Sequence, residues 1–319
     1  MMDIFSREQN SNQWDKLVFN VEDIYHRFPI GRMQEKESIT PTSAFLKKMY
    51  RATYIPLHLR RYIRKLAYQT NLDLGWYQDF AHYWSNILGG RSFWGVQDFY
   101  FLTNLYHVRF QDNQIPDTDD ASLHLAAWQR PELLYQLMHL VYKEISFDYA
   151  MLIKEIFKHN QNMQTFLEFG CGTAPITASL LDFFSSKKSV KIYISDIQTI
   201  AFHYAAYRFL HFKNITPLLL VPETDFKLPD TEPLDVITCI TVFEHLNQPL
   251  ETVRSFHARL KTGGLLIFDY IKSEGDGMDT VQGVRERDAV LDFIASYFDI
   301  LRGDLAQRED IGIIFARKK

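Results

Sequence analysis

The sequence predicts an α/β fold for the second half of the chain and an all-helical fold for the first half. From residue 163 onward, short apolar runs alternate with helical patterns. This order is typical of a parallel sheet with helices on both faces. Before residue 163, apolar and aromatic residues recur at helical spacing instead. We therefore expect a helical N-terminal domain at 1–160 and an α/β domain at 161–319.

The elements of the α/β domain follow a regular order. Strands are expected at 165–169, 190–195, 215–221, 235–243, 265–270, 299–305 and 311–317. Helices are expected at 175–185, 198–212, 247–261 and 285–298, and the third of these should end at Gly263-Gly264. Only five residues separate the last two strands, which is too short for a parallel crossover. The prediction is a mostly parallel seven-stranded sheet with helices on both faces and a C-terminal antiparallel hairpin.

The N-terminal domain is rich in aromatic residues, and all five tryptophans precede residue 130. Helices are predicted at about 41–51, 57–69, 75–88, 94–110, 119–129, 132–146 and 148–159. The helix at 57–69 has a basic cluster of Arg60, Arg61, Arg64 and Lys65. Its apolar stripe favours an ordinary solvated helix face over a phosphate or nucleic-acid patch.

Composition excludes several classes of protein. The net charge of −4 argues against a general polyanion binder, so no nucleic-acid partner is expected. The two cysteines form neither a disulfide framework nor a zinc spacing, and no metal site is expected. The first residues lack a signal-peptide pattern, and no apolar run reaches the length of a membrane span. These observations predict a cytoplasmic protein.

A turn with two glycines connects the first strand to the first helix of the α/β domain. Gly170 and Gly172 allow a sharp turn in which the backbone approaches a ligand closely. Pro175 suits the first turn of the following helix. A dinucleotide fingerprint requires a third glycine at the position that Pro175 occupies, so the sequence disfavours NAD.

The residues Glu168-Phe169-Gly170-Cys171-Gly172-Thr173 resemble motif I of the class I S-adenosylmethionine-dependent methyltransferases. The reversed last strand is also similar to the fold of this class, over about residues 163–319. Ala174 departs from the family pattern, which has a third glycine there. The resemblance implies S-adenosylmethionine as cofactor and S-adenosylhomocysteine as product. It also implies that the turn wraps the methionine end of the cofactor through Glu168, Gly170, Cys171, Gly172 and Thr173.

Acidic residues after the next two strands are candidates for the rest of the cofactor. Asp196, followed by Ile197, closes the second strand, where the family binds the ribose diol. A helix N-cap for 198–212 is the alternative for Asp196. In the loop after the third strand, Asp225 and Phe226 resemble the adenine-binding segment, with Glu223 as an alternative to Asp225.

The end of the fourth strand, Thr241-Val242-Phe243-Glu244-His245-Leu246, resembles the Phe-Glu-His-Leu segment of small-molecule methyltransferases. This implies that Thr241 and Phe243 lie near the cofactor. His245 is a candidate general base, since ligands bind at the carboxyl ends of parallel strands. Alternatively, Glu244 and His245 order the turn and hold the methionine end. Tyr270, at the end of the fifth strand, is a further pocket candidate.

These observations predict a methyltransferase acting on an oxygen, carbon or nitrogen atom of a small or medium-sized organic substrate. The helical domain would form the other wall of the pocket. A non-catalytic scaffold with the same fold and a nucleic-acid methyltransferase are the alternatives. The sequence leaves the oligomeric state open, a homodimer included.

Overall fold

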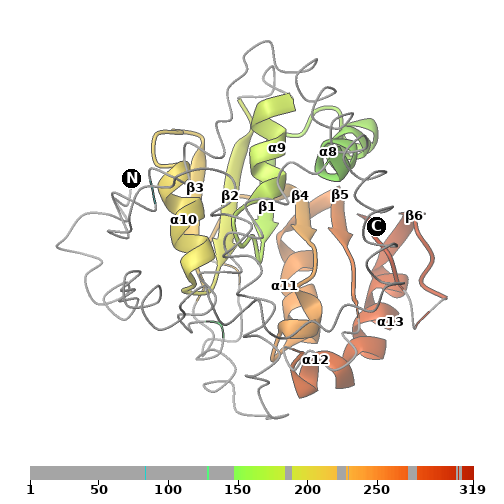
Figure 1. Cartoon of the computed structure of the whole chain (residues 1–319). Coiled ribbons are helices and arrows are strands. Elements are labelled where there is room, and N and C mark those ends of the chain that lie inside the picture. Colours follow the sequence, from blue (N-terminus) through green and yellow to red (C-terminus); the bar gives the residue numbers. More distant parts are fainter. Residues whose placement is uncertain are drawn as a thin grey trace, which may run out of the picture. The chain divides into compact units, whose positions relative to one another are not determined.

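The computed structural model describes residues 83, 128, 147–183, 189–220, 228, 230–271, 279–306, 308 and 311–319 (Figure 1). Most of the predicted N-terminal helices, together with the basic cluster at 60–65, lie outside these residues. The predicted helix at 148–159 lies within them and is present as α8, Phe147–His159.

The α/β domain is built on one seven-stranded sheet. Its order is β3-β2-β1-β4-β5-β7-β6. The first five strands of this order are parallel, whereas β7 is antiparallel to both β5 and β6. The predicted sheet and C-terminal hairpin are therefore confirmed. The strands are β1 Thr165–Phe169, β2 Lys191–Asp196, β3 Ile215–Leu219, β4 Leu234–Cys239, β5 Leu260–Phe268, β6 Phe298–Arg302 and β7 Ile314–Lys318.

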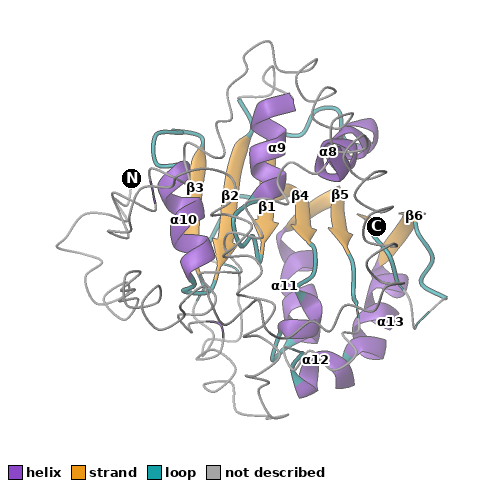
Figure 2. Ribbon diagram, in the orientation of Figure 1, coloured by secondary structure: helices purple, strands orange, loops and turns teal. Residues whose placement is uncertain are grey.

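Helices cover the sheet in two layers (Figure 2). Apolar residues of α8, α9 and α10 pack in one buried cluster, and those of α11 and α13 pack in another. All five residues of β1 are buried, as expected for a central parallel strand between two such layers. Every helix in the described part of the chain is too short or too polar to cross a bilayer. The remaining helices are α9 Pro175–Phe183, α10 Ile200–Arg208, η5 Phe243–His245, α11 Pro249–Arg259, α12 Val281–Arg285 and α13 Arg287–Tyr297.

Most boundaries differ from the prediction by a few residues, and some differences have a clear structural reason. Strand β4 ends at Cys239, not at residue 243, because Thr241 has a φ of 57° and the chain then enters the single turn η5. Helix α11 ends at Arg259, and Gly263-Gly264 lies inside β5 where its register with β4 shifts. The glycine pair therefore accommodates a β-bulge and does not cap a helix. Helix α12 was not predicted.

Helix α8 belongs to the packing of the sheet although it precedes residue 161. Leu152, Ile153 and Ile156 are buried in the same cluster as residues of α9 and β1. The helical layer on this face therefore begins before the predicted domain boundary.

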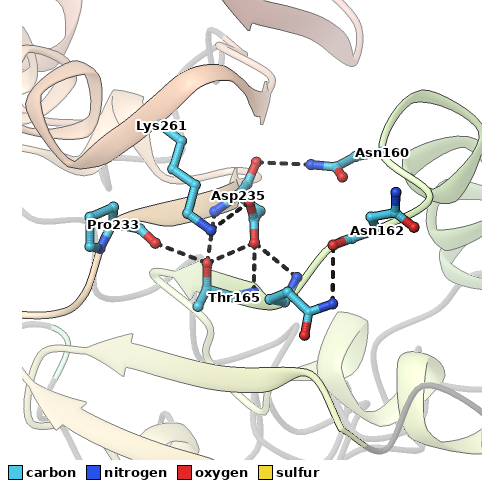
Figure 3. Close-up of polar contacts among 7 residues, drawn as sticks. Asn160, Asn162, Thr165, Pro233, Asp235 and Lys261 are labelled. Carbon is cyan, nitrogen blue, oxygen red and sulfur yellow. Dashed lines mark hydrogen bonds and ion pairs between the residues drawn. The ribbon is translucent and has the colours of Figure 1, made fainter.

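The amino ends of β1 and β4 are joined by a carboxylate (Figure 3). Oδ2 of Asp235 accepts hydrogen bonds from the backbone N–H groups of Gln164 and Thr165 at 2.8 and 2.9 Å, and from the Thr165 hydroxyl at 3.0 Å. Oδ1 pairs with Nζ of Lys261 at 2.8 Å. Burial alone would raise the pKa of Asp235, but these hydrogen bonds lower it below its ordinary value.

Replacing Asp235 by asparagine should lower the free energy of unfolding by about 1–3 kcal/mol at neutral pH, because an ionised acceptor of several hydrogen bonds is lost. Since the pKa of Asp235 is depressed in the folded state, its contribution is present above the unfolded-state value. It is lost as the pH falls below about 4. Chemical denaturation at several pH values measures both effects.

Asp230→Asn is the matched control, because the Asp230 side chain is 98% exposed and pairs only at the surface with Arg259. Such a pair contributes about 0–1 kcal/mol. Equal destabilisation by the two substitutions would contradict the role assigned to Asp235.

Candidate functional site

The carboxyl ends of the parallel strands share one edge of the sheet (Figure 2), and the predicted site residues that the structure describes lie at or next to these strand ends. The register pairs Phe169 of β1 with Ser195 of β2, so Gly170 and Asp196 follow at neighbouring positions. The pairing of Cys239 with Phe268 likewise brings the segments after β4 and β5 together. The topology therefore gathers residues from four strands at one place.

The turn after β1 has an unusual backbone. Gly170, Gly172 and Ala174 all have positive φ values, of 63°, 52° and 55°. A Cβ on Gly170 would lie 2.4 Å from a methyl carbon of Val242, in the segment that follows β4. Glycine is therefore required at 170 both by conformation and by close approach. At Ala174, where the sequence departs from the family pattern, the structure shows the same left-handed conformation.

Glu168 organises the start of α9. Its buried carboxylate accepts hydrogen bonds from the N–H groups of Ile176 at 3.1 Å and Thr177 at 2.8 Å, and from the Thr177 hydroxyl at 2.6 Å. A negative charge there also suits the positive end of the helix dipole. The donors that would hold a pyrophosphate are therefore engaged by Glu168. This geometry disfavours a pyrophosphate at the start of α9.

Asp196 connects β2 to the glycine turn. Its Oδ2 accepts from the Gly172 N–H at 2.6 Å, and its Oδ1 accepts from the Ile197 N–H at 2.7 Å. Each carboxylate oxygen has a further lone pair with which to accept a hydrogen bond, so the two oxygens could accept from the two hydroxyl groups of a ribose. Burial raises the pKa of Asp196 to about 6, and the two N–H groups act against this rise. The carboxylate is therefore mainly ionised at neutral pH.

The N-cap alternative for Asp196 is wrong. Helix α10 begins at Ile200, and its N-cap is Thr199, whose side chain accepts from the Phe202 N–H at 3.1 Å. The cap function is thus carried by another residue, which leaves the Asp196 carboxylate to the turn.

Two buried hydroxyl groups lie beside this turn. Oγ1 of Thr173 and Oγ of Ser195 have no hydrogen-bond partner within the residues that the structure describes. Buried polar groups are normally satisfied, so these hydroxyls suit a polar ligand. Cys171 differs: its side chain is buried in the apolar cluster, and burial raises the pKa of the thiol well above its ordinary value. The side chain of Cys171 therefore packs in the core, and its backbone forms part of the turn.

The segment after β4 is held by the segment after β5. Oδ1 of Asp269 accepts from the Thr241 N–H at 2.5 Å, and Thr241 has the left-handed conformation already described. Glu244 follows in η5 and is buried. Burial raises the pKa of Glu244 to about 8, and the carboxylates of Asp269 and Asp279 add to the rise. Glu244 is therefore mainly protonated at neutral pH.

Phe243 and Tyr270 lie in the hydrophobic core. Their rings stack at a centroid distance of 5.3 Å, and both side chains are almost completely buried. The Tyr270 hydroxyl donates to the carbonyl of Gly283 at 2.5 Å, and burial raises the pKa of this hydroxyl far above its ordinary value. These contacts describe packing roles. The idea that either ring contacts the reactants stays a prediction.

His245 lies at the end of η5 with its side chain 17% exposed. Its ring contacts the Trp128 ring edge-on, with centroids 5.2 Å apart. Its two nitrogens face two carboxyl groups, those of Glu244 and Asp279. His245 is thus both accessible and surrounded by groups that can orient it.

Some of the predicted site residues lie outside the described part of the chain, and two acidic residues near the site were not predicted from the sequence. Asp225, Phe226 and the alternative Glu223 fall among the residues that the structure does not describe. Asp269 and Asp279 were not predicted. Asp269 had the same sequence signal as Asp196, an acid directly after a buried strand. Asp279 had none, because it follows a polar, glycine-containing stretch. Within the described ranges, no group of three His, Cys, Asp or Glu residues could hold a metal ion.

Comparison with known proteins agrees with this geometry. Residues 167–266 match a family model described as a methyltransferase domain. A search of the curated proteins gives no match. This part of the chain is therefore a class I methyltransferase domain, the type that uses S-adenosylmethionine. The glycine turn, the Asp196 carboxylate with its two backbone N–H donors and the buried Thr173 hydroxyl suit that cofactor.

Several solved structures are similar to the chain. One is the N-methyltransferase NodS from Bradyrhizobium japonicum WM9 in complex with S-adenosyl-L-homocysteine, with 15% identity, a TM-score of 0.41 and coverage of 55% of this chain and 87% of that chain. Another is a SAM-dependent methyltransferase from Aquifex aeolicus, with 21% identity, a TM-score of 0.43 and coverage of 58% and 97%. The mitomycin 7-O-methyltransferase MmcR has 11% identity, a TM-score of 0.44 and coverage of 69% and 68%.

Replacing Gly170 by alanine should lower the free energy of unfolding by roughly 2–5 kcal/mol. The left-handed conformation costs about 1–2 kcal/mol for a residue with a Cβ, and the overlap with Val242 adds about 1–3 kcal/mol. Denaturant unfolding measures the change.

Gly263→Ala separates these two costs, because Gly263 has a φ of 77° but nothing within 4 Å of an added Cβ. It should lose only about 1–2 kcal/mol. In a Val242→Ala background, Gly170→Ala should cost less than in the native chain. An equal cost in both backgrounds would show that Gly170 is not constrained by Val242.

Proposed function

We propose that this protein transfers a methyl group from S-adenosylmethionine to an oxygen, carbon or nitrogen atom of a small or medium-sized organic substrate of a biosynthetic pathway. The main support is the Asp196 carboxylate. It is fixed by two backbone N–H groups at the carboxyl edge of the sheet, is ionised at neutral pH and is not used as a helix cap.

The chain's own residues would hold the cofactor along this edge. Asp196 would bind the ribose hydroxyls, and Asp225 with Phe226 would hold the adenine. The turn that Glu168 and Gly170 shape would enclose the methionine end together with Thr173. When bound, the cofactor supplies an electrophilic methyl group. Holding the nucleophile in line with it can lower the barrier by about 7–11 kcal/mol, so the protein's main task is positioning.

His245 is the residue that we propose to accept a proton from the substrate. It lies at the carboxyl end of the central strand β4 and is partly exposed. Glu244 is mainly protonated, so it is a poor competing base at neutral pH. A neutral imidazole could take a proton from a hydroxyl, amine or acidic carbon as the methyl group is transferred.

The aromatic N-terminal domain, residues 1–160, is the part that we propose to select the substrate. Trp128 supports this, because its ring packs edge-on against His245. An aromatic wall next to a polar proton acceptor is typical of pockets for small organic molecules. The acidic net charge and the small-molecule type of segment at 243–246 both weigh against a nucleic-acid substrate.

The first test is ligand choice. S-adenosylmethionine and S-adenosylhomocysteine should stabilise the full chain by about 2.7 kcal/mol at 100 times the dissociation constant. NAD should have no effect, because the N-terminal donors of α9 are engaged by Glu168. Thermal unfolding with each ligand measures this. Stabilisation by NAD alone would sink the proposal.

Asp196→Ala should weaken S-adenosylhomocysteine binding by roughly 10- to 150-fold, because hydrogen bonds to a charged acceptor contribute about 1.5–3 kcal/mol. Affinity in the native chain should also fall as the pH is lowered through about 6, since protonation removes the ionised acceptor. Titration calorimetry from pH 5 to 8 measures both.

Thr199→Ala is the matched control. It removes the N-cap of α10 at a cost of about 1 kcal/mol in stability and should leave affinity unchanged. If Asp196→Ala behaves like Thr199→Ala, Asp196 is structural.

A further inference from the structure

The imidazole of His245 lies between two carboxyl groups that come from different segments of the chain. Nδ1 is 3.6 Å from Oδ1 of Asp279, which precedes α12. Nε2 is 3.8 Å from Oε1 of Glu244, the preceding residue in η5. The Asp279 side chain is 14% exposed, and that of Glu244 is 3% exposed. The two ring nitrogens therefore have chemically different neighbours.

The segment that carries Asp279 is fixed against the segment that carries His245. The Thr280 N–H donates to the Glu244 carbonyl at 2.9 Å, and the Thr280 hydroxyl donates to the Leu246 carbonyl at 2.5 Å. These bonds flank His245 on both sides in sequence. The adjacent residue, Asp279, is therefore held at a defined place relative to the imidazole.

Gly283 allows this close approach. A Cβ at this position would lie 2.3 Å from the Glu244 carbonyl oxygen and 2.7 Å from the Thr280 hydroxyl. The Gly283 N–H instead donates to that hydroxyl at 2.7 Å, which caps α12. The start of α12 and η5 thus form one interlocked unit with His245 at its surface.

The two carboxyl neighbours favour the same form of the imidazole. Glu244 is mainly protonated at neutral pH, and its Oε1 lies 3.8 Å from Nε2, beyond hydrogen-bond distance, so it does not attract a proton to that nitrogen. Oδ1 of Asp279 lies 3.6 Å from Nδ1, and its negative charge favours a proton held there. The nitrogen that carries the proton in a neutral histidine is set by the partner of the other nitrogen.

We propose that Asp279 is a positioning residue that acts through His245. The charge of its carboxylate, 3.6 Å from Nδ1, favours a proton on that nitrogen and so favours the tautomer in which Nε2 can accept a proton from the substrate. This rests on the proposed role of His245 in methyl transfer. The 3.6 Å separation in the free protein is longer than a hydrogen bond, so there the carboxylate acts on Nδ1 through its charge.

The test is the tautomer of His245, read from imidazole nitrogen chemical shifts in the full chain with labelled histidine near pH 7.5. The His245 signal is assigned by its loss in His245→Gln. We expect the native chain to show mainly the Nδ1–H tautomer. Asp279→Ala should shift the population to the Nε2–H tautomer, which free imidazole side chains prefer. Asp279→Asn, which keeps an acceptor oxygen, should retain a larger Nδ1–H fraction than Asp279→Ala.

Asp288→Ala is the matched control, because Asp288 is an exposed aspartate that pairs with Arg308 away from His245. It should show the native spectrum, and circular dichroism should show that all variants fold. A native chain with mainly Nε2–H or doubly protonated imidazole, or an Asp279→Ala variant with the native tautomer, would overturn the assignment.

Cofactor binding is measured on the same samples to separate this inference from the proposed function. Asp279→Ala should bind S-adenosylhomocysteine within about twofold of the native chain, since Asp279 acts on the proton acceptor. A native chain that binds neither sulfur nucleotide refutes the proposed function whatever the tautomer. A native-like tautomer in Asp279→Ala refutes the role of Asp279 even where the cofactor binds.

Discussion

The hydrogen bonds between the Glu168 carboxylate and the first turn of α9 set the geometry on which the rest of the site depends. They join the last residues of β1 to the helix across a turn with three left-handed residues. Because the turn is anchored at both ends, the N–H of Gly172 within it can donate to Asp196 on the neighbouring strand. One buried carboxylate therefore positions the turn, the helix and, through them, the ribose candidate.

The two edges of the sheet differ in character. At the amino edge, Asp235 is surrounded by donors from β1 and by Lys261, and its pKa is lowered. At the carboxyl edge, burial raises the pKa values of Asp196, Glu244 and Asp269. Ala174 and Thr241 adopt strained conformations there. Strain and perturbed carboxyl groups commonly collect where a protein binds or transforms a ligand.

The sequence was sufficient for the sheet because each strand contains a short apolar run, and because the short connection predicted between the last two strands permits only an antiparallel hairpin. It also located Glu168, Gly170 and Asp196, which lie in or directly after the ends of successive strands. It failed where local pattern and tertiary structure disagree. The apolar run at 240–243 looks like strand but turns at Thr241, since Asp269 captures its N–H. Gly263-Gly264 looks like a helix end but forms a bulge, which only pairing with β4 reveals.

The position of Asp279 beside His245 could not be predicted from sequence patterns, for the same reason. Its proximity to His245 comes from the interlock of Thr280 with η5, and neither segment shows this alone. The stacking of Phe243 on Tyr270 is similar, since the two rings come from segments after different strands. The sequence predicted which strand ends carry polar groups. Contacts between the following loops decide which of those groups face one another.

Gly283 has a consequence for how this protein tolerates change. It belongs to none of the motifs that identify the domain, yet any side chain there meets the Glu244 carbonyl or the Thr280 hydroxyl. In saturation mutagenesis we expect nearly every substitution of Gly283 to impair the protein. Most substitutions of the adjacent Val284 should be tolerated, because its side chain is exposed. The steric constraint on the site thus extends into the short helix α12, which lies outside the sequence motifs.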